Sequence, residues 1–77
     1  MYETSDSALA AYLITQGTNE PQITLDKDKQ CVFGFNEIDN LQVLVNSYQS
    51  GNAHGNIYLF FHNYKRLLKR VHNSKIS

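Results

Sequence analysis

A long amphipathic helix near the C-terminus constrains this 77-residue chain more than any other feature. Its apolar residues recur every three or four positions, and at about 100° per residue they fall within an arc of roughly 120°. Asn56 precedes the pattern as the expected N-cap. We therefore predict a helix over about 57–72, with one side covered by the rest of the chain and a frayed tail over 73–77. The predicted buried residues are Ile57, Phe60, Phe61, Tyr64, Leu67, Leu68 and Val71.

A second helix is predicted at the start of the chain, over about 5–16. Thr4 or Ser5 is the expected N-cap, and Asp6 falls in the first turn, where the helix dipole favours an anion. Gly17 suits the left-handed position that follows a helix. Apolar residues occupy so much of the circumference that we expect this helix to be covered on two sides; they are Leu9, Ala10, Ala11, Tyr12, Leu13 and Ile14.

A β-hairpin is predicted over about 22–35. Two short runs, 22–25 and 30–35, alternate apolar with other residues, and the polar stretch 26–29 joins them as a turn of about four residues. One face of the hairpin is then apolar and needs helices or another chain to cover it. The residues expected on that face are Ile23, Leu25, Cys31, Phe33 and Phe35.

The segment over about 37–50 is predicted as a helix between the hairpin and the long helix. Asn36 is its expected N-cap, with Glu37 and Asp39 in the first turn. Its expected buried stripe is Ile38, Leu41, Leu44, Val45 and Tyr48. The chain is therefore predicted to be a single α+β domain over 1–77, ordered α-β-β-α-α, with the hairpin packed against the helices.

Composition narrows the setting in which such a domain is expected. Cys31 is the only cysteine, which excludes a disulfide within one chain, and 42% hydrophobic residues favour a folded core. Met1 leads directly into a polar segment, so we expect no signal peptide and a cytoplasmic location. The longest apolar run, over 8–14, is far shorter than the roughly 20 residues of a membrane span, so no membrane association is expected.

Charge is sorted along the chain. Residues 1–39 carry seven acidic and two basic residues, a net charge of −5, whereas residues 40–77 carry five basic residues and no acidic one, a net charge of +5. Such asymmetry can mark an electrostatic partner, although it does not identify that partner. The two halves could meet within one chain or between two copies, and the sequence leaves both arrangements open.

Nothing in the sequence predicts catalysis, a metal site or a cofactor. His54, His62 and His72 are eight and ten residues apart, which is not the spacing that places two imidazoles on one helical face. Cys31 falls on the apolar face of a predicted strand, where cysteine behaves as a small hydrophobe. Asp26 and Asp28 alternate with lysines in a predicted turn. We therefore expect a protein that is not an enzyme.

A basic face on the long helix is the one feature that predicts a function. Its cations could lie along a phosphate backbone in salt-sensitive contacts, with Asn63 and Tyr58 elsewhere on the exposed surface. The isoelectric point of about 6.8 is nevertheless below the basic values typical of nucleic-acid-binding domains. The candidate polyanion-binding residues are Lys65, Arg66, Lys69, Arg70, His62 and His72.

Two alternatives to nucleic-acid binding stay open. The basic helix could meet an acidic protein surface, with Tyr58 and Leu59 as an exposed interaction patch. The chain could also form a homodimer, with hairpin edges pairing across a two-fold axis. We expect a small accessory or regulatory protein, dimeric, with nucleic acid as the first candidate partner.

Several short motifs resemble a family of small prokaryotic, phage and plasmid proteins described only as a domain of unknown function. They are Thr4-Ser5-Asp6 before Leu9-Ala10-Ala11-Tyr12-Leu13, then Gly17, Val32-Phe33-Gly34-Phe35, Tyr48 to Gly51, and Tyr64-Lys65-Arg66-Leu67-Leu68-Lys69. The resemblance implies a small helix–hairpin–helix–helix domain and points towards mobile elements. It implies no activity, cofactor or catalytic residue.

Overall fold

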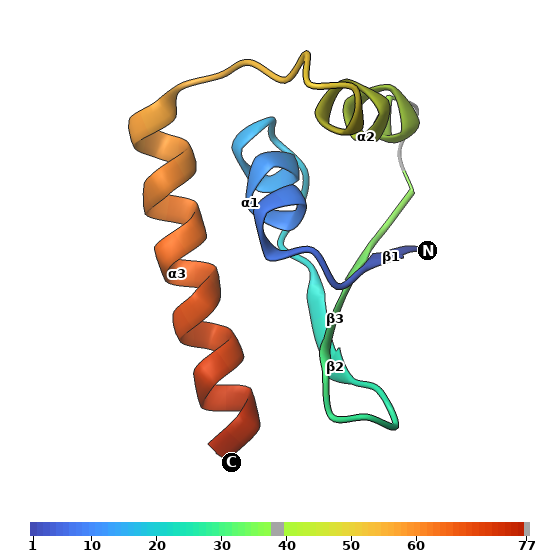
Figure 1. The fold of residues 1–77 in the computed structure, drawn as a ribbon, viewed down its shortest axis with the longest axis vertical. Coiled ribbons are helices and arrows are strands. Elements are labelled where there is room, and N and C mark those ends of the chain that lie inside the picture. Colours follow the sequence, from blue (N-terminus) through green and yellow to red (C-terminus); the bar gives the residue numbers. More distant parts are fainter. Residues whose placement is uncertain (38–39, 77) are drawn as a thin grey trace.

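The computed structural model describes residues 1–37 and 40–76. In these residues three helices pack with a three-stranded antiparallel sheet (Figure 1). The elements in chain order are β1 (Tyr2–Thr4), α1 (Ser7–Thr15), β2 (Gln22–Leu25), β3 (Cys31–Phe35), α2 (Leu41–Gln49) and α3 (Ile57–Ile76). The predicted α+β class is confirmed, and the strand β1 precedes the predicted order of elements.

Helix α1 lies at the centre of the core. Ala10, Ala11 and Leu13 are completely buried, and Leu9 and Tyr12 are nearly so. Figure 1 shows α1 between α2 and α3, with the sheet beyond one end of it. The expectation that this helix is covered on two sides is confirmed.

The predicted N-cap of α1 was wrong by one or two residues. Asp6 is the N-cap, and its Oδ1 accepts hydrogen bonds from the backbone N–H groups of Ala8 at 3.0 Å and Leu9 at 3.2 Å. Thr4 belongs to β1, and its hydroxyl accepts a hydrogen bond from the backbone N–H of Asp6. A carboxylate accepts hydrogen bonds more strongly than a hydroxyl, which favours Asp6 as the cap. Gly17 follows the helix with φ at +102°, as predicted.

The central strand of the sheet is β3, with β1 and β2 on its two sides. Phe33 lies opposite both Thr4 of β1 and Ile23 of β2, and residues directly opposite each other point to the same face. On that face Cys31, Phe33 and Phe35 are buried and join the helices in one core. The predicted apolar face is therefore found for β3, whereas Leu25, at the turn end of β2, is 45% exposed.

The β2–β3 connection spans residues 26–30, close to the predicted turn of about four residues, and a backbone hydrogen bond closes it. The backbone N–H of Asp26 donates to the carbonyl of Gln30 at 2.9 Å, which leaves a loop of Lys27, Asp28 and Lys29. The Asp26 carboxylate accepts hydrogen bonds from the N–H groups of Asp28 and Gln30. Lys29 has φ at +63°, the left-handed conformation that closes three-residue hairpin loops.

Helix α2 begins later than predicted. Asn40 is its N-cap, and Asn36 and Glu37 lie outside the helix. Of the other residues assigned to its start, Ile38 and Asp39 lie outside the described part of the chain. The expected stripe is otherwise found, because Leu41 and Val45 are buried and the side chains at 44 and 48 are half-buried.

Helix α3 is longer than predicted and less completely covered. Asn56 caps it as expected, with its Oδ1 accepting from the N–H of Leu59 at 2.9 Å. The helix continues to Ile76, beyond its predicted end at about residue 72. Of the seven residues predicted to be buried, Phe60, Tyr64, Leu67 and Val71 pack in or against the core, whereas Ile57, Phe61 and Leu68 are 83%, 57% and 41% exposed. Helix α3 packs mainly against α1, at the edge of the molecule (Figure 1), and one neighbouring helix covers only part of so broad an apolar stripe.

Candidate functional site

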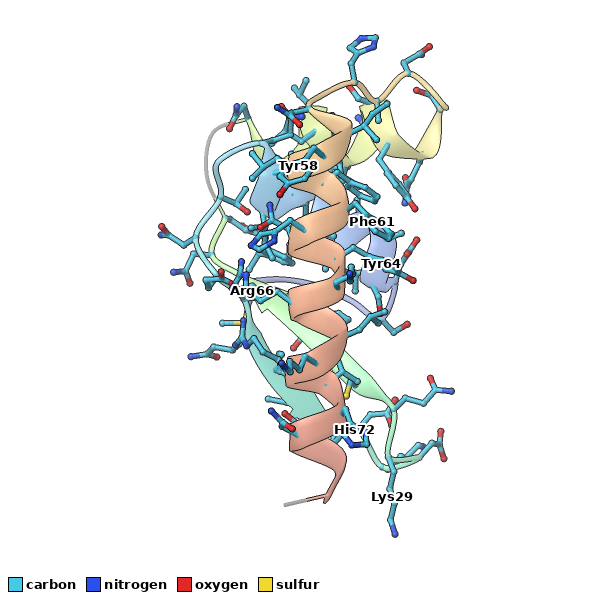
Figure 2. All side chains as sticks on the ribbon, turned by 90° about the vertical axis from the view of Figure 1, so that its left-hand side faces the viewer. Lys29, Tyr58, Phe61, Tyr64, Arg66 and His72 are labelled. Carbon is cyan, nitrogen blue, oxygen red and sulfur yellow. The ribbon has the colours of Figure 1, made fainter. Side chains whose placement is uncertain are left out.

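The outer face of α3 carries the predicted basic residues, and the structure divides them into two groups. Lys65, Lys69, His62 and His72 are exposed, whereas Arg66 and Arg70 are half-buried. Figure 2 looks onto this face and shows Tyr58 towards the viewer, Arg66 at one side of the helix, and Phe61, Tyr64 and His72 towards the other. We call the surface that bears Tyr58, Phe61, His62, Lys65, Lys69 and His72 the outer face.

The two arginines are paired within the chain. Both guanidinium groups bind the carboxylate of Glu20, in the loop before β2: Arg66 contacts Oε1, and Arg70 contacts Oε2 at 2.9 Å. Arg70 also donates to the backbone carbonyl of Pro21 at 3.3 Å. Part of the acidic half of the sequence therefore meets the basic half within one chain. Of the candidate polyanion-binding residues, Arg66 and Arg70 are thus half-buried and already paired with Glu20.

Two exposed lysines remain on the outer face. Lys65 and Lys69 are one helical turn apart, so their side chains extend from the same side of α3. In the described part of the chain, Lys69, His62 and His72 form no hydrogen bond or ion pair. The Lys65 ammonium group lies 5.3 Å from the centre of the Phe61 ring, a distance at which a cation is attracted to an aromatic face. The positive charge of this surface is thus available to an external anion.

Asn63 was predicted on the exposed surface, and this prediction was wrong. Its side chain is only 7% exposed and faces α1. Its Nδ2 donates to the hydroxyl of Thr15 at 3.1 Å, while that hydroxyl donates to the carbonyl of Ala11. Its Oδ1 accepts a weaker bond from Arg66 at 3.4 Å. Asn63 therefore joins the two helices and positions an arginine, and it is not available to a partner.

A shallow hollow of about 630 Å³ lies on the outer face. Its lining side chains form two neighbouring rows at i, i+4 spacing along the helix, so they come from three successive turns. Each row begins with an aromatic ring and continues towards cations. The lining residues are Tyr58, His62 and Arg66 in one row, and Phe61, Lys65 and Lys69 in the other.

Two aromatic rings are exposed on this surface, and the sequence predicted the exposure of only one of them. Tyr58 is 83% exposed, as expected, and Phe61, predicted to be buried, is 57% exposed. Leu59, the other member of the predicted interaction patch, is 42% exposed but does not line the hollow. Because adjacent helical residues point about 100° apart, Tyr58 and Leu59 do not form one patch. The aromatic partner of Tyr58 on this face is Phe61.

A second hollow, of about 400 Å³, lies between α1, the end of α2, the linker over 50–56 and the start of α3. The rings of Tyr12 and Tyr48 lie in its wall with centroids 5.8 Å apart. Burial, followed by the charge of Asp6 and a hydrogen bond to it, raises the pKa of Tyr48 above its ordinary value of 10.0. Across this hollow the Gln16 amide donates to the carbonyl of His54 at 2.7 Å and joins the linker to α1. Apolar surface dominates this hollow, and it carries no cluster of charge.

The histidines and acidic residues do not assemble a metal site in the part of the chain that the structure describes. His54 lies in the linker and His62 and His72 on the outer face, on separate turns of α3. Among residues 1–37 and 40–76, no helix combines the length and the apolar character needed to cross a membrane. The outer face therefore presents cations and aromatic rings as its chemical groups.

Comparison with known proteins shows the family to which the chain belongs. No curated protein and no solved structure matches the chain significantly. A family described as "Domain of unknown function (DUF5659)" matches residues 1–73. The match covers nearly the whole chain, as the sequence resemblance to a small family of unknown function predicted. The chain therefore belongs to the DUF5659 family.

Proposed function

We propose that this protein is a non-enzymatic accessory or regulatory protein that binds nucleic acid through the outer face of α3. The observation that carries the proposal is the pair of exposed lysines, Lys65 and Lys69, on a helix without acidic residues. No Asp or Glu occurs anywhere over residues 40–77, so an approaching polyanion meets no negative charge from this helix. His62 and His72 lie on the same face and add positive charge when they are protonated.

Phosphate contacts of this kind have a measurable signature. Each lysine that neutralises a phosphate releases counterions, so the logarithm of the binding constant falls linearly with the logarithm of salt concentration. The slope is about −0.7 per phosphate contact for a single strand and about −0.9 for a duplex. Because Glu20 neutralises Arg66 and Arg70 in part, we expect a slope that corresponds to about two contacts.

The proposal is tested by fluorescence anisotropy with a labelled 20-nucleotide DNA, offered as a strand and as a duplex over a salt series. The variant Lys65→Gln/Lys69→Gln should bind more weakly than the wild type, with a slope flatter by roughly 1.4 to 1.8. The matched control is Lys27→Gln/Lys29→Gln, which removes the same charge from the exposed β2–β3 turn. Absence of binding to both probes at low salt, or equal weakening by both variants, would reject the proposal.

A second candidate function is association with another protein, including a second copy of this chain. The specific observation in its favour is the exposed apolar edge of α3 formed by Ile57, Phe61 and Leu68. Under this alternative the basic residues would meet an acidic partner surface. Sedimentation equilibrium over micromolar concentrations tests the homodimer: a dimer that Leu68→Gln dissociates would support it, and a single monomeric mass throughout would reject it.

A further inference from the structure

The outer face of α3 exposes two aromatic rings that the charge argument does not use. Tyr58 and Phe61 are 83% and 57% exposed, and both line the same hollow as the two lysines. Phosphate groups do not need aromatic partners, so binding through charge alone gives these rings no role. Their position at the start of two rows that continue into cations suits a ligand with both negative charges and apolar flat surfaces.

We infer that the nucleic acid bound by this face is single-stranded, and that Tyr58 and Phe61 stack on its unpaired bases while Lys65 and Lys69 contact its phosphates. This inference rests on the proposed function and names its substrate class. In a single strand each base offers a π-face to a protein ring, and stacking of this kind tolerates any sequence. A cationic surface that follows the backbone, with aromatic rings along it, is the usual design of proteins that bind single strands.

A duplex fits this surface less well. Its base faces are already stacked on one another, so the Tyr58 and Phe61 rings would meet sugars and phosphates and lose water without gaining a stacking partner. Base edges in a duplex are read most often by arginine side chains that donate two hydrogen bonds. Here Arg66 and Arg70 are directed to Glu20, and Arg70 also to the carbonyl of Pro21. The outer face therefore offers backbone contacts and stacking in preference to base-edge recognition.

The arrangement of the groups along α3 suits a strand that follows the helix. Tyr58 and Lys69 are eleven residues apart, which corresponds to roughly 16 Å of helix. Phe61 and Lys65 are successive members of one i, i+4 row, and the Lys65 ammonium group lies over the Phe61 ring. A base stacked on Phe61 therefore places its own phosphate within reach of Lys65. Lys69 lies one turn further along α3, about 6 Å from Lys65 along the helix, and contacts the next phosphate without a ring of its own.

The inference is tested by measuring the affinity of the full chain for a labelled 20-nucleotide strand and for the duplex of the same sequence at one salt concentration. The wild type should prefer the strand. Tyr58→Ala and Phe61→Ala should each weaken strand binding about 5-fold to 150-fold, the range expected for the loss of one base–aromatic stack, with little effect on the duplex. Tyr58→Phe keeps the ring and should retain the wild-type affinity, whereas Tyr58→Leu keeps only apolar area and should not.

The control is Val43→Ala, which removes a side chain of 63% exposure from α2, away from the outer face. It should leave strand binding unchanged, and circular dichroism establishes that each variant is folded. Equal affinity for strand and duplex, with dependence on Lys65 and Lys69 but not on the rings, would overturn this inference and leave the proposed function in place. Absence of binding to both the strand and the duplex would overturn this inference and the proposed function together.

Discussion

The hydrogen bond between Asn63 and Thr15 predicts that replacing Thr15 lowers stability more than replacing Asn63. Asn63 Nδ2 donates to Thr15 Oγ1 at 3.1 Å across the α1–α3 interface, and the Thr15 hydroxyl donates in turn to the Ala11 carbonyl at 2.8 Å. Thr15→Val leaves the Asn63 amide in a nearly buried position without its acceptor. An unsatisfied buried donor costs about 1–3 kcal/mol. Asn63→Leu leaves Thr15 its bond to Ala11, so it should cost only about 0.5–1.5 kcal/mol, the contribution of one hydrogen bond.

The double variant distinguishes this hydrogen bond from simple packing. With both polar groups replaced by apolar groups of similar size, no buried donor is left unsatisfied. Thr15→Val/Asn63→Leu should therefore be at least as stable as Thr15→Val alone. A domain of this size has a free energy of unfolding of about 4–12 kcal/mol, and a change of 1 kcal/mol shifts its Tm by about 4–8 °C, so these effects are measurable.

The assay is urea unfolding of the wild type, the two single variants and the double variant, followed by circular dichroism. The cycle should give a coupling energy of about 0.5–1.5 kcal/mol between Thr15 and Asn63. Effects that add to within about 0.3 kcal/mol would show that the bond does not contribute to stability, and the reasoning about Asn63 would be refuted.

Three further predictions concern other parts of the chain. Burial and Asp6 raise the pKa of Tyr48, so the folded state keeps a proton that the unfolded state loses above pH 10, and the free energy of unfolding should fall as pH rises through that range. The free energy of unfolding of Tyr48→Phe should lack the part of this pH dependence that comes from Tyr48. Lys29→Gly should raise the free energy of unfolding by up to about 1 kcal/mol, because Lys29 has a left-handed φ of +63° that glycine adopts without strain, and a lower Tm would contradict this. Glu20→Gln should lower stability by less than about 1 kcal/mol, because the ion pairs of Glu20 are half-exposed. The same change should strengthen nucleic-acid binding, because it releases both arginines. Weaker binding would show instead that the ion pairs position the binding surface.

The sequence predicted the elements with strong periods and clear end signals. The α3 period, the Asn56 cap, Gly17 and the buried positions of β3 follow from side-chain spacing and backbone preference, which are local properties. Strand β1 was missed because three residues are too few to show alternation. Its Thr4 also resembles a helix cap, a role that the Asp6 carboxylate takes.

The candidate site was predicted in part, because pairing across the fold is not visible in local sequence. The contact of Arg70 with Glu20 joins residues 50 positions apart, and nothing near either residue in the sequence indicates the other. Periodicity identified the apolar width of α3 but not which part of it α1 covers, so Phe61 was assigned to the core. Asn63 was assigned to the surface because it is polar, although its angular position on α3 lies between the buried Leu67 and the half-buried Arg66. That position was the signal that could have indicated its burial.

The most direct test of the central claim is to map the binding surface by NMR. Backbone ¹⁵N–¹H spectra of the full chain would be recorded during titration with a single-stranded 20-nucleotide DNA at low salt. The account predicts the largest shift changes along the outer face of α3, from Tyr58 to His72, and little change at the equally cationic Lys27 and Lys29 of the β2–β3 turn. Changes centred on that turn or on the hollow beside Tyr48, or a spectrum that does not change, would contradict it.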